Sequence, residues 1–527
     1  MGMAIGTSSS DWHRLSTMYH GSVYYYLTDI AYHFGGLTTF AARFLPALYS
    51  SISIVLVYLL VKELEGRKLA LLSSAFFAFL SMQAVYGTVS IMEPFLMPLL
   101  LLSLLLFVRH LKAGKRNDLL LAVAFFAVAV TTKLSALYFL PAFGVLFASS
   151  RHKGVLFVGA KSKKRNELPA EFIGLAAFLL LPIVAYNYLL YESRGLTDFM
   201  VLRILNLESS AKWYATQGML PPVPQIYNAD LVHALLANIS IPAALLALIG
   251  IYAAFRKGKS FYVAFLAFPL LTFNFYVFHD YYLVLLAPQL AILSAFGAEK
   301  LGSLLPELNR RTVVLAVAVL FIASELLLFA GLTAGASSTY KLREYALSLQ
   351  KEKPILLDPL ISPVRAFWAF NEFPLMTSLG LFKEKQKWVD AGAVDTVTEN
   401  FIYVECVADY CGYNRTEYWG YSNFSDYFNG IVHERSDKML EIMGPQGPEY
   451  AVWNVAIDLP GQMLPFSTKK TFLGYVFGHP ELSADVYSVR TPVQKLIDAV
   501  AQMSILLNIA LVISVPLFAA KGVLGSR

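Results

Sequence analysis

Long apolar stretches, separated by short polar loops, run through most of the chain. Such stretches can cross roughly 30 Å of hydrocarbon as helices, because a helix satisfies its own backbone hydrogen bonds. The pattern therefore predicts a polytopic α-helical membrane protein with about eleven transmembrane helices. We place these helices at residues 43–61, 69–85, 94–108, 119–132, 134–149, 168–188, 234–255, 261–278, 283–298, 313–335 and 500–520.

The apolar stretch at residues 119–149 is too long for one ordinary crossing. As a single helix it would extend roughly 46 Å, against roughly 30 Å of hydrocarbon. A single helix would also move the basic segment 161–165 to the side of the membrane that positively charged loops avoid. We therefore predict two short crossings with a turn at Lys133.

The composition changes between residues 337 and 490, where charged residues return and the apolar runs become short. Strand-like runs alternate there with helical patterns, which is typical of an α/β layer that folds in water. The strand-like runs are 354–358, 401–407, 449–455 and 484–489, and the helical patterns are 340–350 and 437–443.

These patterns divide the chain into four parts. Residues 1–42 form an outer loop without a cleavable signal, in which the aromatic segment 20–35 is too short to span and is expected to lie in the membrane interface. Residues 43–335 form a transmembrane core, and residues 336–495 form an extracytoplasmic soluble α/β domain. Residues 496–527 add a last transmembrane helix and a short cytoplasmic tail.

The overall composition agrees with a membrane protein. With 57% hydrophobic and only 15% charged residues, the chain has more apolar surface than a water-soluble fold can bury. The formal charge of +6 does not indicate nucleic acid as a partner, because the basic residues occur in short loops and do not gather on one face.

The basic loops also predict the orientation, because short loops rich in lysine and arginine stay in the cytoplasm. The N-terminus and the soluble domain are then outside the cytoplasmic membrane, and the C-terminus is inside. The loops predicted to be inside contain Lys62, Arg67 and Lys68; Arg109, Lys112, Lys115 and Arg116; residues 151–165; Arg256, Lys257 and Lys259; Lys300, Arg310 and Arg311; and Lys521.

The two cysteines, Cys406 and Cys411, lie in the predicted outer domain. A local disulfide and two free thiols both remain open on the sequence alone. Their spacing does not match that of a zinc site, and we predict no metal and no cofactor. The halves of the chain show no inverted symmetry of the kind that many secondary transporters have, which is a weak argument against a carrier.

Polar residues with useful chemistry gather at the predicted outer membrane boundary. Carboxylates there can act as a base, imidazoles can carry protons, and cations can hold a phosphate. The candidate catalytic residues are Glu93, His20 and Asp11, and the candidate substrate-binding residues are Arg43, Lys133, His279, Asp280 and Tyr282.

Each candidate also has a simpler interpretation. Glu93 precedes Pro94 and can be a carboxylate that favours a helix N-terminus. Lys133 can be a lysine that extends from a helix end toward water. Arg43 can cap a helix at the interface, and the turn 279–282 can anchor two helices through its aromatic rings.

The order of several motifs resembles the glycosyltransferase C superfamily, and in particular the protein O-mannosyltransferase and aminoarabinose-transferase-like enzymes. The motifs are Met-Tyr-His-Gly-Ser-Val-Tyr-Tyr-Tyr at 18–26, His-Phe-Gly-Gly at 33–36, Ala-Ala-Arg-Phe-Leu-Pro-Ala-Leu at 41–48, the outer loop that ends at Glu93, Thr-Thr-Lys at 131–133 and His-Asp-Tyr-Tyr-Leu-Val-Leu-Leu-Ala-Pro at 279–288.

The resemblance implies transfer of a sugar from a polyprenyl (dolichyl) phosphate to a protein, lipid or glycan acceptor at the outer face of the membrane. Lys133 and Arg43 would hold the phosphate, while Glu93 and His20 would line the acceptor side. The chain departs from the family in two respects: Ser22 replaces a usual proline, and the only carboxylate that precedes the histidine motif is Asp11, nine residues before His20.

In the family, an acidic pair follows a first span well before the histidine motif, and neither is present at that place in this sequence. We therefore expect either that a first span is missing from this reading frame or that the chain is a degenerate or partner-dependent member. The alternative function is a non-catalytic protein that binds a lipid-linked sugar or assists a flippase.

Overall fold

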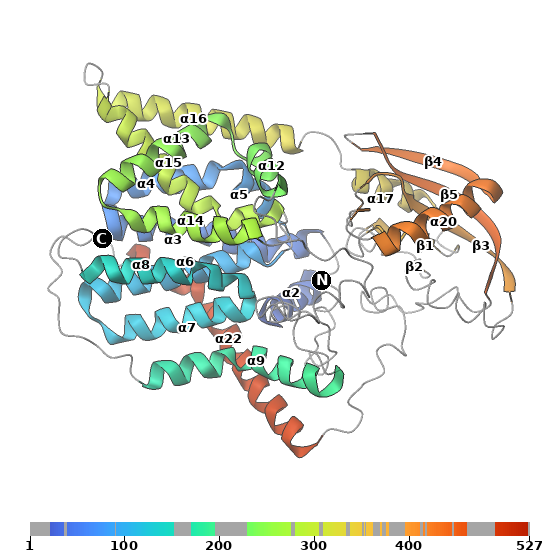
Figure 1. The fold of residues 1–527 in the computed structure, drawn as a ribbon, viewed down its shortest axis with the longest axis horizontal. Helices are drawn as coiled ribbons and strands as arrows, with labels where there is room; N and C mark the ends of the chain where they lie inside the picture. Colours follow the sequence, from blue (N-terminus) through green and yellow to red (C-terminus); the bar gives the residue numbers. More distant parts are fainter. Residues whose placement is uncertain are drawn as a thin grey trace. The chain divides into compact units, whose positions relative to one another are not determined.

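A computed structural model gives the fold of the chain (Figure 1). The helical unit comprises Tyr19–Tyr186, Pro222–Ala334 and Thr491–Arg527, and the sheet unit is built mainly from Gly335–Arg490. The structure describes residues 22–35, 39–89, 91–151, 170–194, 229–275, 280–304, 309–333, 338–349, 353, 355–361, 369–370, 376–378, 396–409, 411, 415–416, 419–444, 447–460 and 491–524.

Helices account for nearly all of the described helical unit (Figure 1). In chain order they are α2 (Ser22–Gly35), α3 (Thr39–Glu65), α4 (Arg67–Phe79), α5 (Ser81–Tyr86), α6 (Glu93–Ala113), α7 (Arg116–Thr132), η1 (Leu134–Phe139), α8 (Leu140–Arg151), α9 (Ala170–Arg194), α12 (Ala229–Asn238), α13 (Ile241–Arg256), α14 (Ser260–Phe275), η2 (Asp280–Leu285), α15 (Ala287–Leu304), α16 (Arg310–Thr333) and α22 (Pro492–Leu524).

The helices confirm a membrane protein with several apolar helices. Among the described residues, 4 helices (α3, α6, α16 and α22) are long and apolar enough to cross a membrane, and the bent pair α12 and α13 would make a fifth crossing. Each range predicted as a crossing contains a helix, but several of these helices are shorter than a full span. The number of crossings therefore stays a prediction.

The predicted turn at Lys133 is confirmed. Helix α7 ends at Thr132, and Lys133 adopts an extended backbone with φ −158° and ψ 131° before η1 begins. The rings of Phe126 and Phe143 lie 5.1 Å apart on the two arms that flank this turn. The segment 119–149 therefore folds back on itself as a hairpin.

Three of the predicted inner loops lie at one end of the helical unit. At the C-terminal end of α3, Glu63 pairs with Arg109 at 3.3 Å and Glu65 pairs with Lys259 at 3.1 Å. Gly522, near the end of α22, lies against Leu59 of α3 at this same end. The alternation of basic and less basic loops along the sequence thus corresponds to two opposite ends of the helical unit.

Two ranges that we predicted as continuous crossings are broken, and these predictions are corrected here. Range 69–85 breaks at Leu80, which is extended between α4 and α5. Range 234–255 bends by 111° between α12 and α13. Ser240 accepts a hydrogen bond from the backbone N–H of Ala243, and Pro242 follows in the first turn, so the local sequence starts a new helix there.

Prolines inside two apolar helices leave backbone carbonyls without their helical partners, and neighbouring helices supply the missing donors. Pro516 of α22 frees the carbonyl of Val512, to which the Tyr49 hydroxyl of α3 donates at 3.0 Å. In the same way, Ser504 donates to the carbonyl of Phe178 at 2.6 Å, four residues before the proline of α9. These contacts fix α22 against α3 and α9.

The sheet unit contains five described strands in the order β2-β1-β3-β5-β4 (Figure 1). Strand β1 pairs in parallel with β2 and β3, whereas β5 pairs antiparallel with β3 and β4. The elements are α17 (Ser338–Ser348), β1 (Ile355–Leu357), β2 (Met376–Ser378), β3 (Thr396–Cys406), α20 (Trp419–Arg435), β4 (Asp437–Gly444) and β5 (Gly447–Pro460).

A helix covers each face of this sheet, which agrees with the predicted α/β layer. Leu342 of α17 packs with Ile355 and Val452 on one face. Phe428 and Val432 of α20 pack on the opposite face, where Leu356 and Phe401 are buried. The predicted strands 354–358, 401–407 and 449–455 and the predicted helix 340–350 are found, while the predicted strand 484–489 lies outside the described residues.

The helical pattern predicted at 437–443 is wrong, because this segment forms strand β4. Its alternate residues Leu440 and Ile442 pack against the core of the sheet unit, whereas Met439, Glu441 and Met443 are exposed. In so short a segment the apolar residues fit both a helical and an alternating pattern. The segment forms a strand because it pairs with β5.

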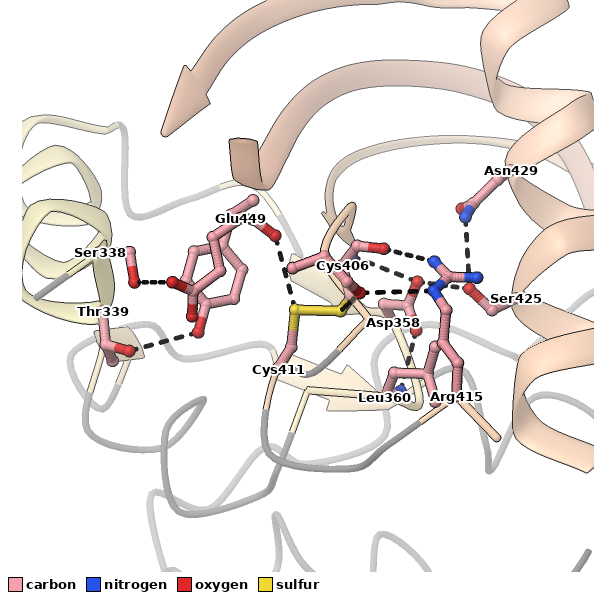
Figure 2. The surroundings of a disulfide bond; sticks show 12 residues. Ser338, Thr339, Asp358, Leu360, Cys406, Cys411, Arg415, Ser425, Asn429 and Glu449 are labelled. Atoms are coloured by element: carbon pink, nitrogen blue, oxygen red, sulfur yellow. Dashed lines mark hydrogen bonds between the residues drawn. A yellow bond between two sulfur atoms is a disulfide. The ribbon is translucent and has the colours of Figure 1, made fainter. Parts of the chain in front are cut away.

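Cys406 and Cys411 form a disulfide at the end of β3 (Figure 2). Beside it, the buried carboxylate of Asp358 accepts hydrogen bonds from the Ser425 hydroxyl at 2.6 Å and the Leu360 backbone N–H at 2.8 Å. Burial raises the pKa of Asp358 above its usual value in spite of these donors. The disulfide closes the loop after β3, and the Asp358 carboxylate joins the end of β3 to α20 through the Cys406 N–H and the Ser425 hydroxyl.

We expect the disulfide to stabilise the sheet unit by about 2 kcal/mol, because it closes a short loop in the unfolded chain. The double variant Cys406→Ala/Cys411→Ala should therefore unfold at a lower urea concentration, measured by proteolysis of the sheet unit in the full-length protein. A reducing agent should shift the wild type to the same midpoint and leave the variant unchanged. An unchanged wild-type midpoint under reduction would contradict the expectation.

Candidate functional site

The site begins with a carboxylate at the start of α6. Glu93 is the first residue of this helix and Pro94 follows it, so the local sequence places a negative charge at the positive end of the helix dipole. The side chain is only 1% exposed. A carboxylate buried to this extent requires a charged or hydrogen-bonding partner.

Lys133 is that partner. Its extended backbone lies between α7 and η1, and its ammonium group forms an ion pair and a hydrogen bond with the Glu93 carboxylate. The Lys133 side chain is 17% exposed, so part of this side chain reaches the surface while its partner does not. The turn at Lys133 thus directs the lysine toward the start of α6, rather than toward water.

Two tyrosines of η2 complete the cluster. The Lys133 ammonium lies 4.5 Å from the ring centroid of Tyr282 and 5.3 Å from that of Tyr281. The two rings meet edge to face with centroids 4.9 Å apart, and Tyr282 stacks on Phe273 of α14. We call Glu93, Lys133, Tyr281 and Tyr282 the Lys133 site.

Aromatic packing behind Glu93 fixes the start of α6. Phe95 is fully buried, and its ring contacts Tyr24 of α2 at 5.6 Å and Tyr49 of α3 at 4.3 Å. Two helices, α2 and α3, therefore hold the first turn of α6, which reduces the freedom of Glu93 to follow a ligand. The residue that can move toward a ligand is Lys133, because it lies at a break between helices.

This arrangement suits recognition of an anion with an attached apolar group. The carboxylate and the aromatic faces hold the lysine ammonium group in one place. This group has three N–H donors, so it can also donate a hydrogen bond to a phosphate oxygen. The surrounding rings exclude water, which strengthens such a contact. The arrangement can therefore hold an anionic group, such as a phosphate, at the end of the helical unit opposite the basic loops.

The structure brings together some of the predicted site residues. Glu93, Lys133 and Tyr282 meet in the Lys133 site. Arg43 is exposed on the first turns of α3, and Asp280 is the first residue of η2. Asp11, His20 and His279 lie outside the described residues.

Two residues of the helical unit were left out of the candidates that the sequence predicted. Tyr281 was weighed only together with the rest of the turn 279–282, although its ring faces Lys133. Glu325, a fully buried carboxylate in the middle of α16, was not recognised as a candidate. A carboxylate inside a long apolar run is itself the signal that could have found it.

Comparison with known families gives a match over the part of the chain that contains Glu93 and Lys133. Residues 19–163 match the family of dolichyl-phosphate-mannose-protein mannosyltransferases. Among curated proteins, none matches the chain in sequence.

The fold of most of the chain is similar to that of a solved structure. Superposed on ArnT from Cupriavidus metallidurans bound to undecaprenyl phosphate, the chain has a TM-score of 0.51 at 12% identity, over 86% of this chain and 93% of that chain. The same enzyme in the apo state gives 0.49 at 14% identity, over 86% and 92% of the two chains. The apo oligosaccharyltransferase of Archaeoglobus fulgidus gives 0.46 at 11% identity, over 90% and 73%.

Proposed function

We propose that this chain, a membrane protein with the glycosyltransferase C fold, transfers a sugar from a polyprenyl phosphate to an acceptor at the membrane surface. The Lys133 site is the observation that carries the proposal. It places a partly exposed lysine beside aromatic rings, and this lysine lies in the segment that matches a dolichyl-phosphate-mannose-dependent family. Protein, lipid and glycan acceptors remain equally compatible with this site.

The first step in the proposed reaction is binding of the lipid phosphate by Lys133. The phosphate departs with the electron pair of the anomeric C–O bond, so a cation beside it stabilises the charge that develops as the bond breaks. Tyr281 and Tyr282 hold the lysine from one side and can contact the sugar or the lipid from the other. Arg43, exposed at the start of α3, is a second candidate for the phosphate.

Glu93 has a different role in this proposal from that of an acceptor base. In an in-line displacement, the base and the leaving phosphate lie on opposite sides of the anomeric carbon. Direct contact between Glu93 and Lys133 does not leave room for a sugar between them. We therefore assign to Glu93 the role of keeping Lys133 charged and oriented, and we leave activation of the acceptor to Asp11 or His20.

The proposed orientation puts the Lys133 site and the sheet unit outside the cell. The basic loops at the opposite end of the helical unit support this, because such loops stay in the cytoplasm. The disulfide in the sheet unit supports it independently, since disulfides persist in oxidising compartments.

Membranes that contain the chain should transfer label from a polyprenyl-phosphate sugar. Because Tyr282 lies closest over Lys133, Tyr282→Leu should lower this transfer at least about tenfold. The matched control is Tyr252→Leu, since Tyr252 is 58% exposed on α13 near the end with the basic loops, and it should transfer at the wild-type rate.

Equal transfer by both tyrosine variants would show that the Lys133 site does not bind the sugar donor. Binding of the lipid-linked sugar without transfer, in the wild type, would instead favour the non-catalytic alternative.

A further inference from the structure

Glu325 is a second buried carboxylate of the helical unit, outside the Lys133 site. It lies in the apolar interior of α16, and its side chain is fully buried. A carboxylate at such a depth is unfavourable unless several donors compensate for the loss of water. Its partners therefore show what holds it there.

Both oxygens of Glu325 accept hydrogen bonds from backbone N–H groups at helix starts. The N–H of Ser81, the first residue of α5, donates to Oε2 at 2.7 Å. The N–H of Ser240, the N-cap of α13, donates to Oε1 at 3.1 Å. Such N–H groups have no partner within their own helix, and the helix dipole favours a negative charge beside them. The Glu325 carboxylate thus accepts hydrogen bonds from unpaired backbone N–H groups at two helix breaks, one before α5 and one before α13.

Further hydrogen bonds connect the same elements. The hydroxyl of Ser81 donates to the carbonyl of Asn238, the last residue of α12, at 2.9 Å. The hydroxyls of Ser240 and Ser324 lie 3.0 Å apart. The start of α5, the bend between α12 and α13, and the interior of α16 are therefore joined at one place around Glu325.

The elements that meet at Glu325 also support the Lys133 site. Both α5 and α12 contact η2, the short helix that carries Tyr281 and Tyr282. The chain also runs from the end of α5 through a short loop to Glu93. A change in the position of α5 would consequently move three members of the Lys133 site relative to the lysine.

We infer that Glu325 is a positioning residue of the Lys133 site, which acts by holding the starts of α5 and α13 in one arrangement and thereby fixes α5 and α12 against η2. Its effect on sugar transfer rests on the proposed function, but its effect on the geometry of the site does not. The enclosure of Lys133 by its neighbours can be measured without a sugar donor.

Lys259 is a suitable internal reference for such a measurement. Its side chain is 17% exposed, as is that of Lys133, and it pairs with Glu65 as Lys133 pairs with Glu93. It lies at the end of the helical unit with the basic loops. A membrane-permeant amine-reactive ester therefore meets two lysines of equal exposure and similar pairing at opposite ends of the same protein.

The experiment compares labelling of the two lysines by mass spectrometry in the full chain in lipid nanodiscs. Glu325→Leu removes both acceptors, and we expect the ratio of Lys133 to Lys259 labelling to rise about fivefold or more. Glu325→Gln keeps one acceptor oxygen and should raise the ratio by about twofold. The matched control is Ser294→Ala, which removes a buried hydrogen bond to α13 that does not involve α5, and its ratio should stay at the wild-type value.

An unchanged ratio in both Glu325 variants would overturn the inference. Equal increases at both lysines would also overturn it, because they would show a general loosening of the helical unit. If Glu325→Leu does not fold, the graded effect of Glu325→Gln against Ser294→Ala decides. A raised ratio in a protein that never transfers sugar would sustain the inference while rejecting the proposed function.

Discussion

Replacing Lys133 by methionine is expected to weaken binding of a polyprenyl phosphate by about 100-fold and to destabilise the helical unit by about 3 kcal/mol. The two effects have different causes. Binding weakens because the phosphate loses its cation. Stability falls because the Glu93 carboxylate, which is 1% exposed, is left buried without a partner.

A second variant separates these causes. In Glu93→Gln/Lys133→Met both charges are absent, so the buried ion pair is replaced by neutral groups of similar size, and most of the stability should return. Binding of the lipid phosphate should not return, because the cation is still missing. Glu93→Gln alone should keep part of the binding, since Lys133 retains its charge but loses the partner that orients it.

The measurements are thermal unfolding and lipid binding of the full chain in detergent, with polyprenyl phosphate alone as the ligand. Wild-type binding by the double variant would show that Lys133 does not contact the phosphate. Full stability in Lys133→Met would show that the buried Glu93 carboxylate does not depend on Lys133 as its partner, and the assigned pairing of the two residues would fail.

The sequence predicted many features of the helical unit because their signals are local. The length of the apolar runs predicted the helices, and the excess length of the run 119–149 predicted the turn at Lys133. Loop charge gives the grouping of the basic loops, which the pairs of Glu63 and Glu65 support. Each of these features depends on neighbours in the sequence, so a single chain is sufficient to find it.

The direct contact between Glu93 and Lys133 could not be predicted in the same way. Both were placed at one membrane boundary, but a boundary fixes depth and not lateral position. Which helices are neighbours depends on close packing between segments that are distant in the sequence. For the same reason, we predicted a phosphate role for Lys133 and an acceptor role for Glu93, although the two side chains touch.

The helix breaks were missed for a related reason. Hydropathy averages over a window, so a bend of 111° between two apolar segments leaves no trace in it. The break is stable because a carboxylate from another helix, Glu325, accepts the free backbone N–H groups. In the sheet unit, β4 was taken for a helix because its pairing partner β5, rather than its own pattern, determines its conformation.

The largest effect on stability is expected from Gly250→Ala. Helices α13 and α15 cross with their backbones almost in contact: a Cβ at Gly250 would lie 1.7 Å from the carbonyl oxygen of Leu293. Because the obstructing atom belongs to the backbone, no side-chain rotation can relieve the clash, and the helices must separate. We expect a loss of at least about 3 kcal/mol in thermal unfolding of the full chain.

Gly331→Ala is the matched control, since a Cβ at this helical position of α16 meets no atom within 4 Å. It should leave the stability unchanged or raise it by up to about 1 kcal/mol, because alanine favours a helix over glycine. Equal effects of the two substitutions would show that α13 and α15 are not packed backbone to backbone.

A second close contact at the same crossing of α13 and α15 allows a further test of this packing. A Cβ at Gly297 of α15 would lie 2.0 Å from the carbonyl oxygen of Leu246, so each helix contributes one glycine to the same crossing. Once one alanine has forced the helices apart, the second meets a gap that already exists. The double variant Gly250→Ala/Gly297→Ala should therefore lose less stability than the sum of the two single variants. Strict additivity would show that the two glycines act at independent contacts.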